Sequence, residues 1–232
     1  MNDAVVWHEL ECAGYDADLA VWLRLARGYG SPVLDIGAGT GRVCLPLARA
    51  GHRTHAVDLD PELAAELRRR GEGSDLRVHC ADAQTLDLGI SFAQIIVPMQ
   101  TIHLFDDRSA FLRRAAAHLL PGGLLAIALL GDGVEAFEEE LPPDVLEADG
   151  VRWVSRPTAL RLVSDGVQLE RRRERTHNGT TSVDLDLKLL RHLDCDTLVL
   201  EAADQFDPLP SIRVPATYEY AGSEIVMLRR RA

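Results

Sequence analysis

One glycine-rich loop and three aspartates are the residues whose types and spacing could bind a ligand. The loop, GAGTG at residues 37–41, follows the apolar run 32–36. Glycines let the backbone turn tightly and approach a ligand closely. Dinucleotide-binding loops read Gly-x-Gly-x-x-Gly, but here Arg42 stands where the third glycine would be, and the Gly-Lys-Ser/Thr of a Walker loop is absent. The loop therefore predicts a ligand that is not held by its phosphate.

Each aspartate stands near the end of an apolar run. Asp35 precedes the glycine loop, Asp58 closes the next run, and Asp82 follows the third. A carboxylate such as that of Asp58 can accept two hydrogen bonds from a ribose diol, and Asp82 can accept one from an exocyclic amine. Three acids without a phosphate-binding cation favour a cationic nucleoside without phosphate, and S-adenosylmethionine is such a molecule.

The elements that must position these residues alternate between strands and helices. Short apolar runs predict buried parallel strands at residues 32–36, 54–59, 76–80, 93–98 and 124–130. Between them, Asp60-Pro61 begins one predicted helix, which ends near Gly71, and Asp107 or Ser109 caps another, which Pro121-Gly122-Gly123 stops. This alternation predicts an α/β fold with a doubly wound, Rossmann-like, mostly parallel sheet.

The rest of the chain predicts additions to that sheet. Residues 15–30 fit an amphipathic helix with Leu19, Trp22, Leu23 and Ala26 on one side. Residues 131–150 contain eight acids and no base, and the runs 158–163, 167–175 and 182–190 then predict a small antiparallel sheet with one wet face. In the last run Val183, Leu185, Leu187 and Leu189 alternate with Asp184, Asp186 and Lys188. A helix from Asp194 to about Gln205 and a hairpin turning near Ala221-Gly222 complete the chain.

These elements divide into three predicted regions. Residues 1–130 form a ligand-binding core with an N-terminal helix, residues 131–192 form an acidic segment and an antiparallel lid insertion, and residues 193–232 form a helix and hairpin that complete the core sheet. Both the fold and this division are expectations from the sequence pattern.

Composition limits the partners and the location. The net charge of −11 argues against a nucleic-acid backbone or an anionic membrane as partner. The four cysteines are scattered without a Cys-x-x-Cys pair, so we expect buried thiols in a reducing compartment and no metal site. Without a signal-peptide pattern or a membrane-length apolar run, we expect a soluble, cytoplasmic protein acting on a small molecule, as a monomer or homodimer.

The motifs together resemble a known family. VLDIGAGTGR, VDLDPE, ADA and LPGGLLAI occur in that order on successive predicted strand ends, and this combination resembles the class I S-adenosylmethionine-dependent methyltransferases over roughly residues 15–130. One departure is Phe92-Ala93-Gln94, where such enzymes often have Phe-Asp. The resemblance implies the small-molecule type, because the insertion after the fifth strand is similar to the lid of methyltransferases that act on small molecules, including amino sugars.

The resemblance also implies roles for particular residues. Asp35 and the loop Gly37, Ala38, Gly39 and Gly41 would hold the methionine part of S-adenosylmethionine, with S-adenosylhomocysteine as product. Asp58 would hold the ribose, Leu59, Asp82 and Ala83 would face the adenine, Pro98 would pass near the methyl-bearing sulfur, and Tyr15 would fold over the cofactor. Apart from the resemblance, the position of Gln100 and His103 just past the fourth predicted strand, where ligands of such sheets bind, leads us to expect that Gln100 orients the substrate and that His103 contacts it as general base.

The expected reaction is an in-line transfer of the methyl group to oxygen or nitrogen, with carbon as a further option. Three alternatives stay open at the sequence level. The chain could be a non-catalytic S-adenosylmethionine-binding module, it could use the cofactor for another reaction, or it could be a dinucleotide oxidoreductase, which the glycine spacing opposes.

Overall fold

A computed structural model describes residues 2–131, 133–218 and 220–231 in two compact units. Unit 1 consists of the described residues up to Gly14 together with Gly133–His192, and unit 2 consists of the described residues of 15–132 and 193–232. In that described part, no helix is long and apolar enough to cross a membrane. Residues 2–14, which the sequence grouped with the core, belong to unit 1.

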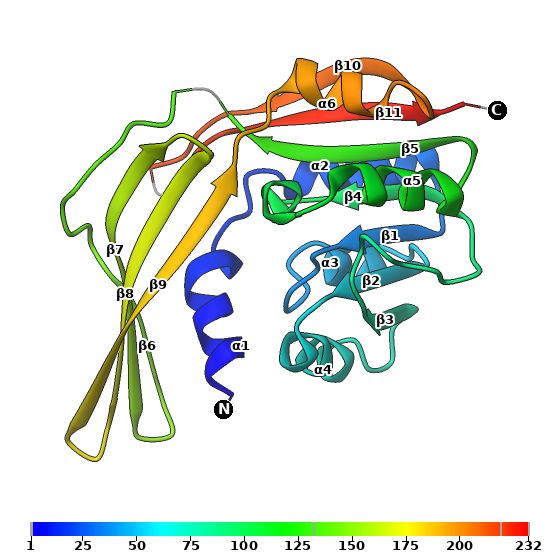
Figure 1. Ribbon diagram of the computed structural model, residues 1–232. Helices are drawn as coiled ribbons and strands as arrows, with labels where there is room; N and C mark the ends of the chain where they lie inside the picture. Colours follow the sequence, from blue (N-terminus) through cyan, green and yellow to red (C-terminus); the bar gives the residue numbers. More distant parts are fainter. Residues whose placement is uncertain (1, 132, 219, 232) are drawn as a thin grey trace. The chain divides into compact units, whose positions relative to one another are not determined.

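Unit 2 is built on a seven-stranded sheet in the order β10-β11-β5-β4-β1-β2-β3 (Figure 1). The neighbouring pairs from β3 to β5 are parallel, and β10 and β11 are antiparallel additions beside β5. The strands are β1 (Val33–Ile36), β2 (Thr54–Asp58), β3 (Leu76–Cys80), β4 (Phe92–Val97), β5 (Leu119–Leu130), β10 (Phe206–Val214) and β11 (Ser223–Arg230). This arrangement confirms the predicted Rossmann-like sheet with an antiparallel hairpin.

Helices cover the sheet of unit 2, and alternate strand residues supply the core under each layer. Leu34 and its neighbours on one face pack with side chains of α5 (Arg108–His118) and α6 (Cys195–Ala202). Val33 on the other face packs with α2 (Leu19–Tyr29) and α3 (Cys44–Arg49), and α4 (Pro61–Arg70) packs beside β2 through Leu67. The side chain of Asp35 therefore points to the α2 and α3 side, since strand residues alternate between faces.

Helix starts follow the predicted capping chemistry. The Asp60 carboxylate accepts the N–H of Glu62 with Pro61 in the first turn, and Asp107 caps α5. Asp194 caps α6 in the same way. The end of α5 differs from the prediction, because the helix stops at His118 and the Pro-Gly-Gly sequence already lies in β5.

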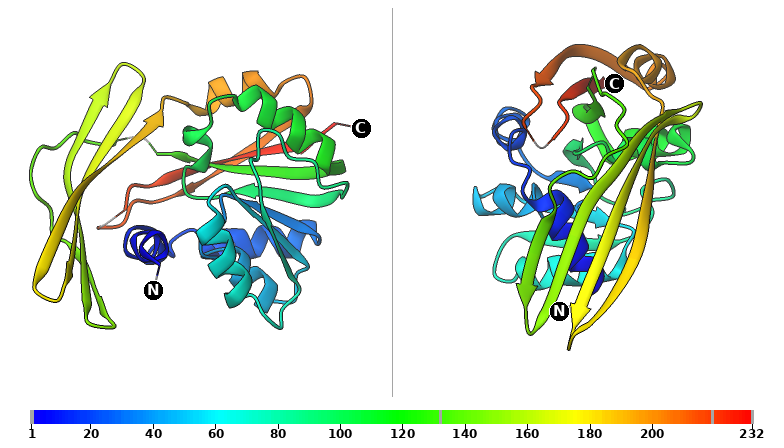
Figure 2. Two further views of the ribbon diagram at one scale, coloured as in Figure 1. Left: turned by 60° about the horizontal axis from the view of Figure 1, so that its bottom comes forward. Right: turned by 90° about the vertical axis from the view of Figure 1, so that its left-hand side faces the viewer.

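Unit 1 contains a four-stranded antiparallel sheet in the order β6-β7-β8-β9 (Figure 2). Its strands are β6 (Asp144–Ala148), β7 (Val151–Val163), β8 (Gly166–His177) and β9 (Thr180–Arg191). Helix α1 (Asp3–His8) continues into a π-helical turn at Glu9–Ala13 and packs against Val151 and Trp153 of β7. Neither α1 nor β6 was predicted, since β6 lies inside the acid-rich segment.

Two expectations about burial are wrong. Among the described cysteines only Cys44 is buried, while Cys80 is exposed and the other two are intermediate. On β9 the wet face is not confined to the charged side: Val183, Leu185 and Leu187 are exposed, and so are Asp184 and Lys188 on the other side, while Asp186 is largely covered and pairs with Arg173 at 2.9 Å. Alternation along a strand shows which residues share a face, but it does not show which face is covered.

Candidate functional site

The predicted ligand-binding aspartates lie at one edge of the sheet of unit 2. Asp35 is the third residue of β1, Asp58 is the last of β2, and Asp82 follows the end of β3. Because these strands are parallel neighbours, their carboxyl ends share an edge. β4 pairs with the other side of β1, so the strand order reverses there. Ligands of open α/β sheets bind at such a switch point.

The glycine loop bonds to protein acceptors. Gly37 and Ala38 both donate their N–H to Val57 O, at 2.9 and 3.0 Å, and Gly41 donates to Ala38 O at 3.0 Å. Gly39 donates to Asp58 Oδ2 at 2.7 Å. A phosphate cradle needs N–H groups that point at the ligand. These N–H groups are engaged with the protein, which agrees with the absence of a phosphate-binding motif.

Close packing explains two of the glycines. Gly37 has a φ of +68°, and a Cβ there would meet Thr101 Cγ2 at 2.5 Å. Gly41 has a φ of +105°, and its Cβ would meet side-chain atoms of Leu45 and Leu67 at 2.6 Å. Both positions thus combine backbone strain with overlap for any other residue. The loop is fixed against the segment after β4 and against α3 and α4.

At the end of β2, the carboxylate of Asp58 stands next to the apolar side chain of Leu59. Asp58 accepts the Gly39 N–H through Oδ2 and the Asp60 N–H through Oδ1, at 2.9 Å. A carboxylate has about four lone-pair sites, so each oxygen keeps one for a further donor. Leu59 is 70% exposed although it is apolar. An acceptor beside an exposed apolar surface suits a ribose and its attached base.

Asp82 is held by a residue that sequence reasoning missed. Its Oδ1 accepts from the backbone N–H of Gln84 at 2.8 Å and from the Gln84 side-chain amide at 3.1 Å. The Gln84 side chain also accepts the N–H of Asp107 at 2.6 Å, which ties the turn after β3 to the start of α5. Ala83 is buried.

Asp35 is a buried carboxyl with an unusual pKa. Burial raises the pKa of Asp35 from 3.8 to about 7, against the opposing charge of Arg42 and hydrogen bonds from Cys44. Within the described residues its Oδ1 has no hydrogen-bond partner. Because a buried unpaired carboxylate oxygen is costly, this atom is suited to a cationic or hydrogen-bonding ligand.

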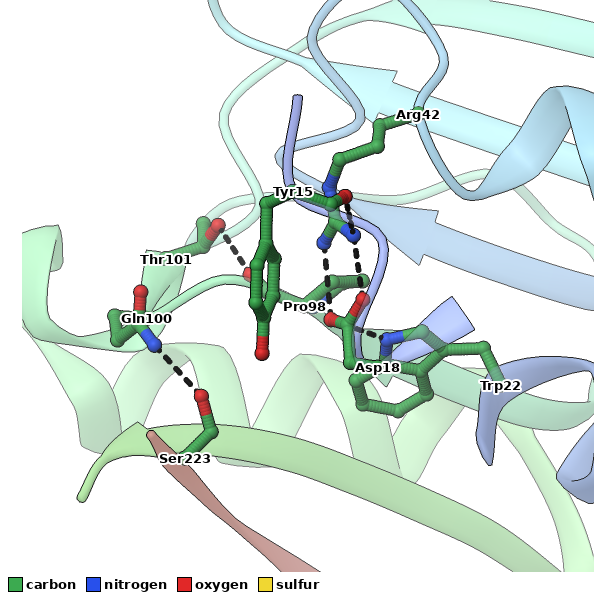
Figure 3. Close-up of polar contacts among 8 residues, drawn as sticks. All are labelled: Tyr15, Asp18, Trp22, Arg42, Pro98, Gln100, Thr101 and Ser223. Carbon is green, nitrogen blue, oxygen red and sulfur yellow. Dashed lines mark hydrogen bonds and ion pairs between the residues drawn. The ribbon is translucent and has the colours of Figure 1, made fainter. Parts of the chain in front are cut away.

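Arg42 pairs with Asp18 in the interior of unit 2 (Figure 3). The guanidinium contacts both Asp18 oxygens at 2.5 and 3.0 Å, and Asp18 also accepts Trp22 Nε1–H at 2.7 Å. Arg42 also donates to the Tyr15 carbonyl at 3.0 Å, and its guanidinium lies 5.0 Å from the centroid of the Tyr15 ring. The pair therefore holds the segment before α2 against the glycine loop. In the sequence the one sign of this pair was Arg42, which stands where a dinucleotide-binding loop has its third glycine.

Tyr15 is buried, and its ring centroid lies 5.1 Å from that of Tyr220. Its hydroxyl has no hydrogen-bond partner among the described residues. Burial raises the pKa of Tyr15, although the Ser223 hydroxyl acts to lower it, so the Tyr15 hydroxyl stays protonated at neutral pH.

The segment after β4 turns through left-handed backbone at Met99 and Gln100, with φ of +50° and +57°. Gln100 donates to Ser223 Oγ of β11 at 2.8 Å, and Thr101 Oγ1 donates to Pro98 O at 2.9 Å (Figure 3). Two non-glycine residues in this conformation cost energy, and such strain clusters at functional sites. The Gln100 nitrogen is thus engaged with the protein.

His103 lies in the 3-10 turn Thr101–Leu104 and is buried. Its Nε2 accepts the N–H of Leu130 at 3.0 Å. This ring nitrogen is therefore occupied, which favours a role in fixing the end of β5. Catalysis by His103 stays a prediction.

Comparison with known proteins finds a family match over part of the chain. The family described as "Methyltransferase domain" matches residues 33–123, which span β1 to the start of β5. The ubiquinone biosynthesis O-methyltransferase of Bradyrhizobium diazoefficiens is 31% identical over 132 residues, covering 56% of this chain and 50% of the relative. The cypemycin N-terminal methyltransferase of a Streptomyces species is 31% identical over 136 residues, covering 53% of this chain and 56% of the relative. The chain thus spans about half the length of the curated relatives it matches.

Solved structures match over nearly the whole chain. The sugar N-methyltransferase KedS8 of Streptoalloteichus has a TM-score of 0.79 at 20% identity, covering 99% of this chain and 92% of the other. CalS10, an amino pentose methyltransferase of Micromonospora echinaspora solved with S-adenosylmethionine bound, has a TM-score of 0.73 at 20% identity, covering 97% and 96%. At this identity the likeness shows the fold. Residues 33–123 therefore match a methyltransferase domain family, and the chain has the fold of these solved methyltransferases.

Proposed function

We propose that this protein transfers a methyl group from S-adenosylmethionine to an oxygen or nitrogen atom of a small molecule. The observation that carries the proposal is the set of groups at the carboxyl ends of β1 and β2. It comprises the orphan oxygen of Asp35, the remaining acceptor sites of Asp58 and the exposed side chain of Leu59. A sulfonium nucleoside offers matching parts, namely a cationic methionine end, a ribose diol and a flat base.

Each residue has a proposed binding role. Asp35 holds the methionine end, Asp58 accepts from the ribose hydroxyls, and Leu59 lies against the adenine. Asp82, oriented by Gln84, accepts from the adenine amine. Tyr15 folds over the cofactor, since it is buried and its carbonyl accepts a hydrogen bond from Arg42, which follows the glycine loop.

When bound, S-adenosylmethionine supplies a methyl group on a positively charged sulfur, which is already activated for displacement. The protein contributes orientation, which is worth roughly 7–11 kcal/mol when the reacting atoms are held in line. The fixed turn at Pro98–Thr101 and the anchored glycine loop provide a rigid frame for this. A neutral amine acceptor needs no general base, whereas a hydroxyl acceptor must lose its proton, so a proton-accepting residue is required only for the oxygen class.

The similar proteins support a small-molecule acceptor. The curated relatives are described as acting in ubiquinone biosynthesis and on the N-terminus of cypemycin, and the solved neighbours as acting on sugars. Among the neighbours that match nearly the full length, KedS8 is described as a sugar N-methyltransferase and CalS10 as an amino pentose methyltransferase. A nitrogen acceptor on a small polar molecule is therefore the first class to test.

Calorimetric titration with S-adenosylmethionine, S-adenosylhomocysteine and NAD tests the cofactor. We expect the first two to bind and NAD not to bind. Incubation with amine and hydroxyl acceptors, read by mass spectrometry for a methylated product, then tests transfer. Binding without any product across the acceptor classes would favour a non-catalytic module, and binding of NAD alone would refute the proposal.

Asp58→Ala should weaken S-adenosylmethionine binding about 10- to 100-fold, because a hydrogen bond to a charged acceptor contributes about 1.5–3 kcal/mol. Asp87→Ala is the matched control, since the exposed Asp87 also accepts a backbone N–H two residues ahead, from Gly89. The measurement is calorimetric affinity, with circular dichroism to verify folding. Equal affinities of the two variants would contradict the ribose assignment.

A further inference from the structure

Ser223, the first residue of β11, is held in place by the strands on both sides of it. Its Cα partners are Leu130 at the end of β5 and Val214 at the end of β10. Beside it, Gly131 donates its N–H to Gly222 O at 2.9 Å, and a Cβ on Gly131 would meet that oxygen at 2.8 Å. Ser223 is only 4% exposed. Because β5 is parallel to β4, this fixed and buried hydroxyl lies at the sheet edge of the proposed cofactor site.

The Ser223 hydroxyl lies between two segments that are far from it in the sequence. Gln100, in the turn after β4, donates from its side chain to Ser223 Oγ at 2.8 Å (Figure 3). The backbone of Gln100 is left-handed, with a φ of +57°, and such strain persists only where the surroundings hold it. The other segment contributes Tyr15, whose hydroxyl is the end of the ring that points toward Ser223 in Figure 3.

The directions of the donors in this group follow from the contacts. Gln100 occupies one acceptor site of the Ser223 oxygen, so Ser223 keeps its single hydrogen as a donor. Tyr15 Oη is buried without a hydrogen-bond partner among the described residues, and the Ser223 hydroxyl acts to lower the pKa of Tyr15. A hydroxyl that lowers the pKa of a phenol is one that faces the phenol oxygen as a donor. A phenol oxygen approached in this way has its own hydrogen left for a further acceptor.

We propose that Ser223 is a positioning residue of the cofactor site, which directs its hydrogen to Tyr15 Oη and so turns the Tyr15 hydrogen toward an oxygen atom of bound S-adenosylmethionine. The proposal rests on the proposed function, because it takes S-adenosylmethionine as the ligand under Tyr15. The donors then run in one direction, from Gln100 through Ser223 to Tyr15, and each bond of such a chain strengthens the next. Ser223 does not touch the ligand, so its effect must pass through the Tyr15 hydroxyl.

Nuclear magnetic resonance of tyrosine labelled at Cζ tests the contact without any ligand, because the Cζ signal reports hydrogen bonding to the phenol oxygen. The chain has four tyrosines, and Tyr15→Phe identifies the Tyr15 signal by its loss. Ser223→Ala should shift this signal, and Ser223→Thr, which keeps the hydroxyl, should restore it. Ser211→Ala is the matched control, since Ser211 is an exposed serine of the same hairpin that donates to Glu224, and it should leave the Tyr15 signal in place.

Calorimetric titration with S-adenosylmethionine tests the effect on binding. Ser223→Ala should weaken binding about 3- to 10-fold, the range of one neutral hydrogen bond. The same change made in the Tyr15→Phe variant should have no further effect, because the hydroxyl through which Ser223 acts is then absent. A serine that only supports the strands would cost the same affinity in both backgrounds. Circular dichroism verifies that each variant is folded.

The outcomes separate this proposal from the proposed function. An unmoved Tyr15 signal in Ser223→Ala, or equal losses of affinity in the two backgrounds, would overturn the role of Ser223 while cofactor binding stands. An unaltered protein that does not bind S-adenosylmethionine would refute the proposed function, and the role of Ser223 with it.

Discussion

The carboxyl of Asp35 shows how much a single buried group can set the behaviour of the site. It lies in β1, where both neighbouring strands and the helices on its side exclude water. A protonated Asp35 is neutral and easily buried, while the ionised form lacks a partner for Oδ1 among the described residues. A cationic ligand would favour the ionised form, so ligand binding and the titration of Asp35 should be linked.

Asp35→Asn should change the pH dependence of stability. Between pH 4 and 7 folded Asp35 keeps a proton that the unfolded chain has released, so the free energy of unfolding falls as pH rises through this window. The loss amounts to at most about 4 kcal/mol, and the asparagine variant should not show it.

Urea unfolding of both proteins from pH 4.5 to 7.5 measures the effect. Relative to the unaltered protein, the variant should gain stability as pH rises. Asp87→Asn, which changes an exposed acid, should run parallel to the unaltered protein. Parallel curves for Asp35→Asn as well would show that Asp35 titrates normally.

At the scale of elements, the ion pair between Asp18 and Arg42 joins the segment before α2 to the loop after β1. Its side chains are 1% and 9% exposed. Because both charges lose their hydration, such a pair contributes little net free energy to stability. Removing one partner, however, leaves an uncompensated buried charge.

Arg42→Met should therefore lower the free energy of unfolding by about 3–5 kcal/mol. Asp18→Asn should also be destabilising. The stability loss of the double variant should be about 1–3 kcal/mol smaller than the sum of the two single losses. The exposed pair Arg231–Asp207, at 2.9 Å in the same unit, is the control and should show less than about 1 kcal/mol of coupling. Additive losses at Arg42 and Asp18 would mean that the two side chains act independently.

Local signals in the sequence predicted most of the elements of unit 2. The capping aspartates at 60, 107 and 194 and the five apolar runs rest on interactions within a few residues, and the structure has all of them. Partners far apart in the chain were not predictable. Arg42 bonds to Asp18, and Gln100 to Ser223, only because the fold brings them together.

The site was predicted as a set of strand ends, and the structure places those ends on one edge. Sequence could not show that Gly37 and Gly41 are required by Thr101, Leu45 and Leu67 as well as by the backbone turn. Nor could it show that the nitrogens of Gln100 and His103 are engaged within the protein. The roles of the predicted cofactor and substrate residues stay predictions.

At the scale of the whole molecule, the two units have unequal cores. Unit 2 contains two large clusters of buried apolar side chains that span its strands and helices. The cluster of unit 1 is built on Val6, Val151 and Trp153. Since burial of apolar surface is the main stabilising term, unit 1 should be the less stable of the two.

Heating should therefore unfold unit 1 before unit 2. The tryptophans report on this, because Trp7 and Trp153 lie in unit 1 and Trp22 lies in unit 2. In a Trp22→Phe variant the fluorescence comes from unit 1. It should change at a lower temperature than the one at which β1 and β4 of unit 2 lose their protection from hydrogen exchange. One transition with the same midpoint by both measurements would show that the chain unfolds as a single cooperative unit.

The order of strands in unit 2 has a consequence for biosynthesis. β5 pairs with β11 through Leu124–Leu130, yet β6 to β9 lie between them in the chain. At a synthesis rate of 5–20 residues per second, the nascent chain exposes the apolar edge of β5 for roughly 5–20 s before β11 is made. The hairpins of unit 1 are contiguous in sequence and can form on the ribosome during that interval. A chaperone that shields strand edges would therefore act on this protein mainly while unit 1 is being translated.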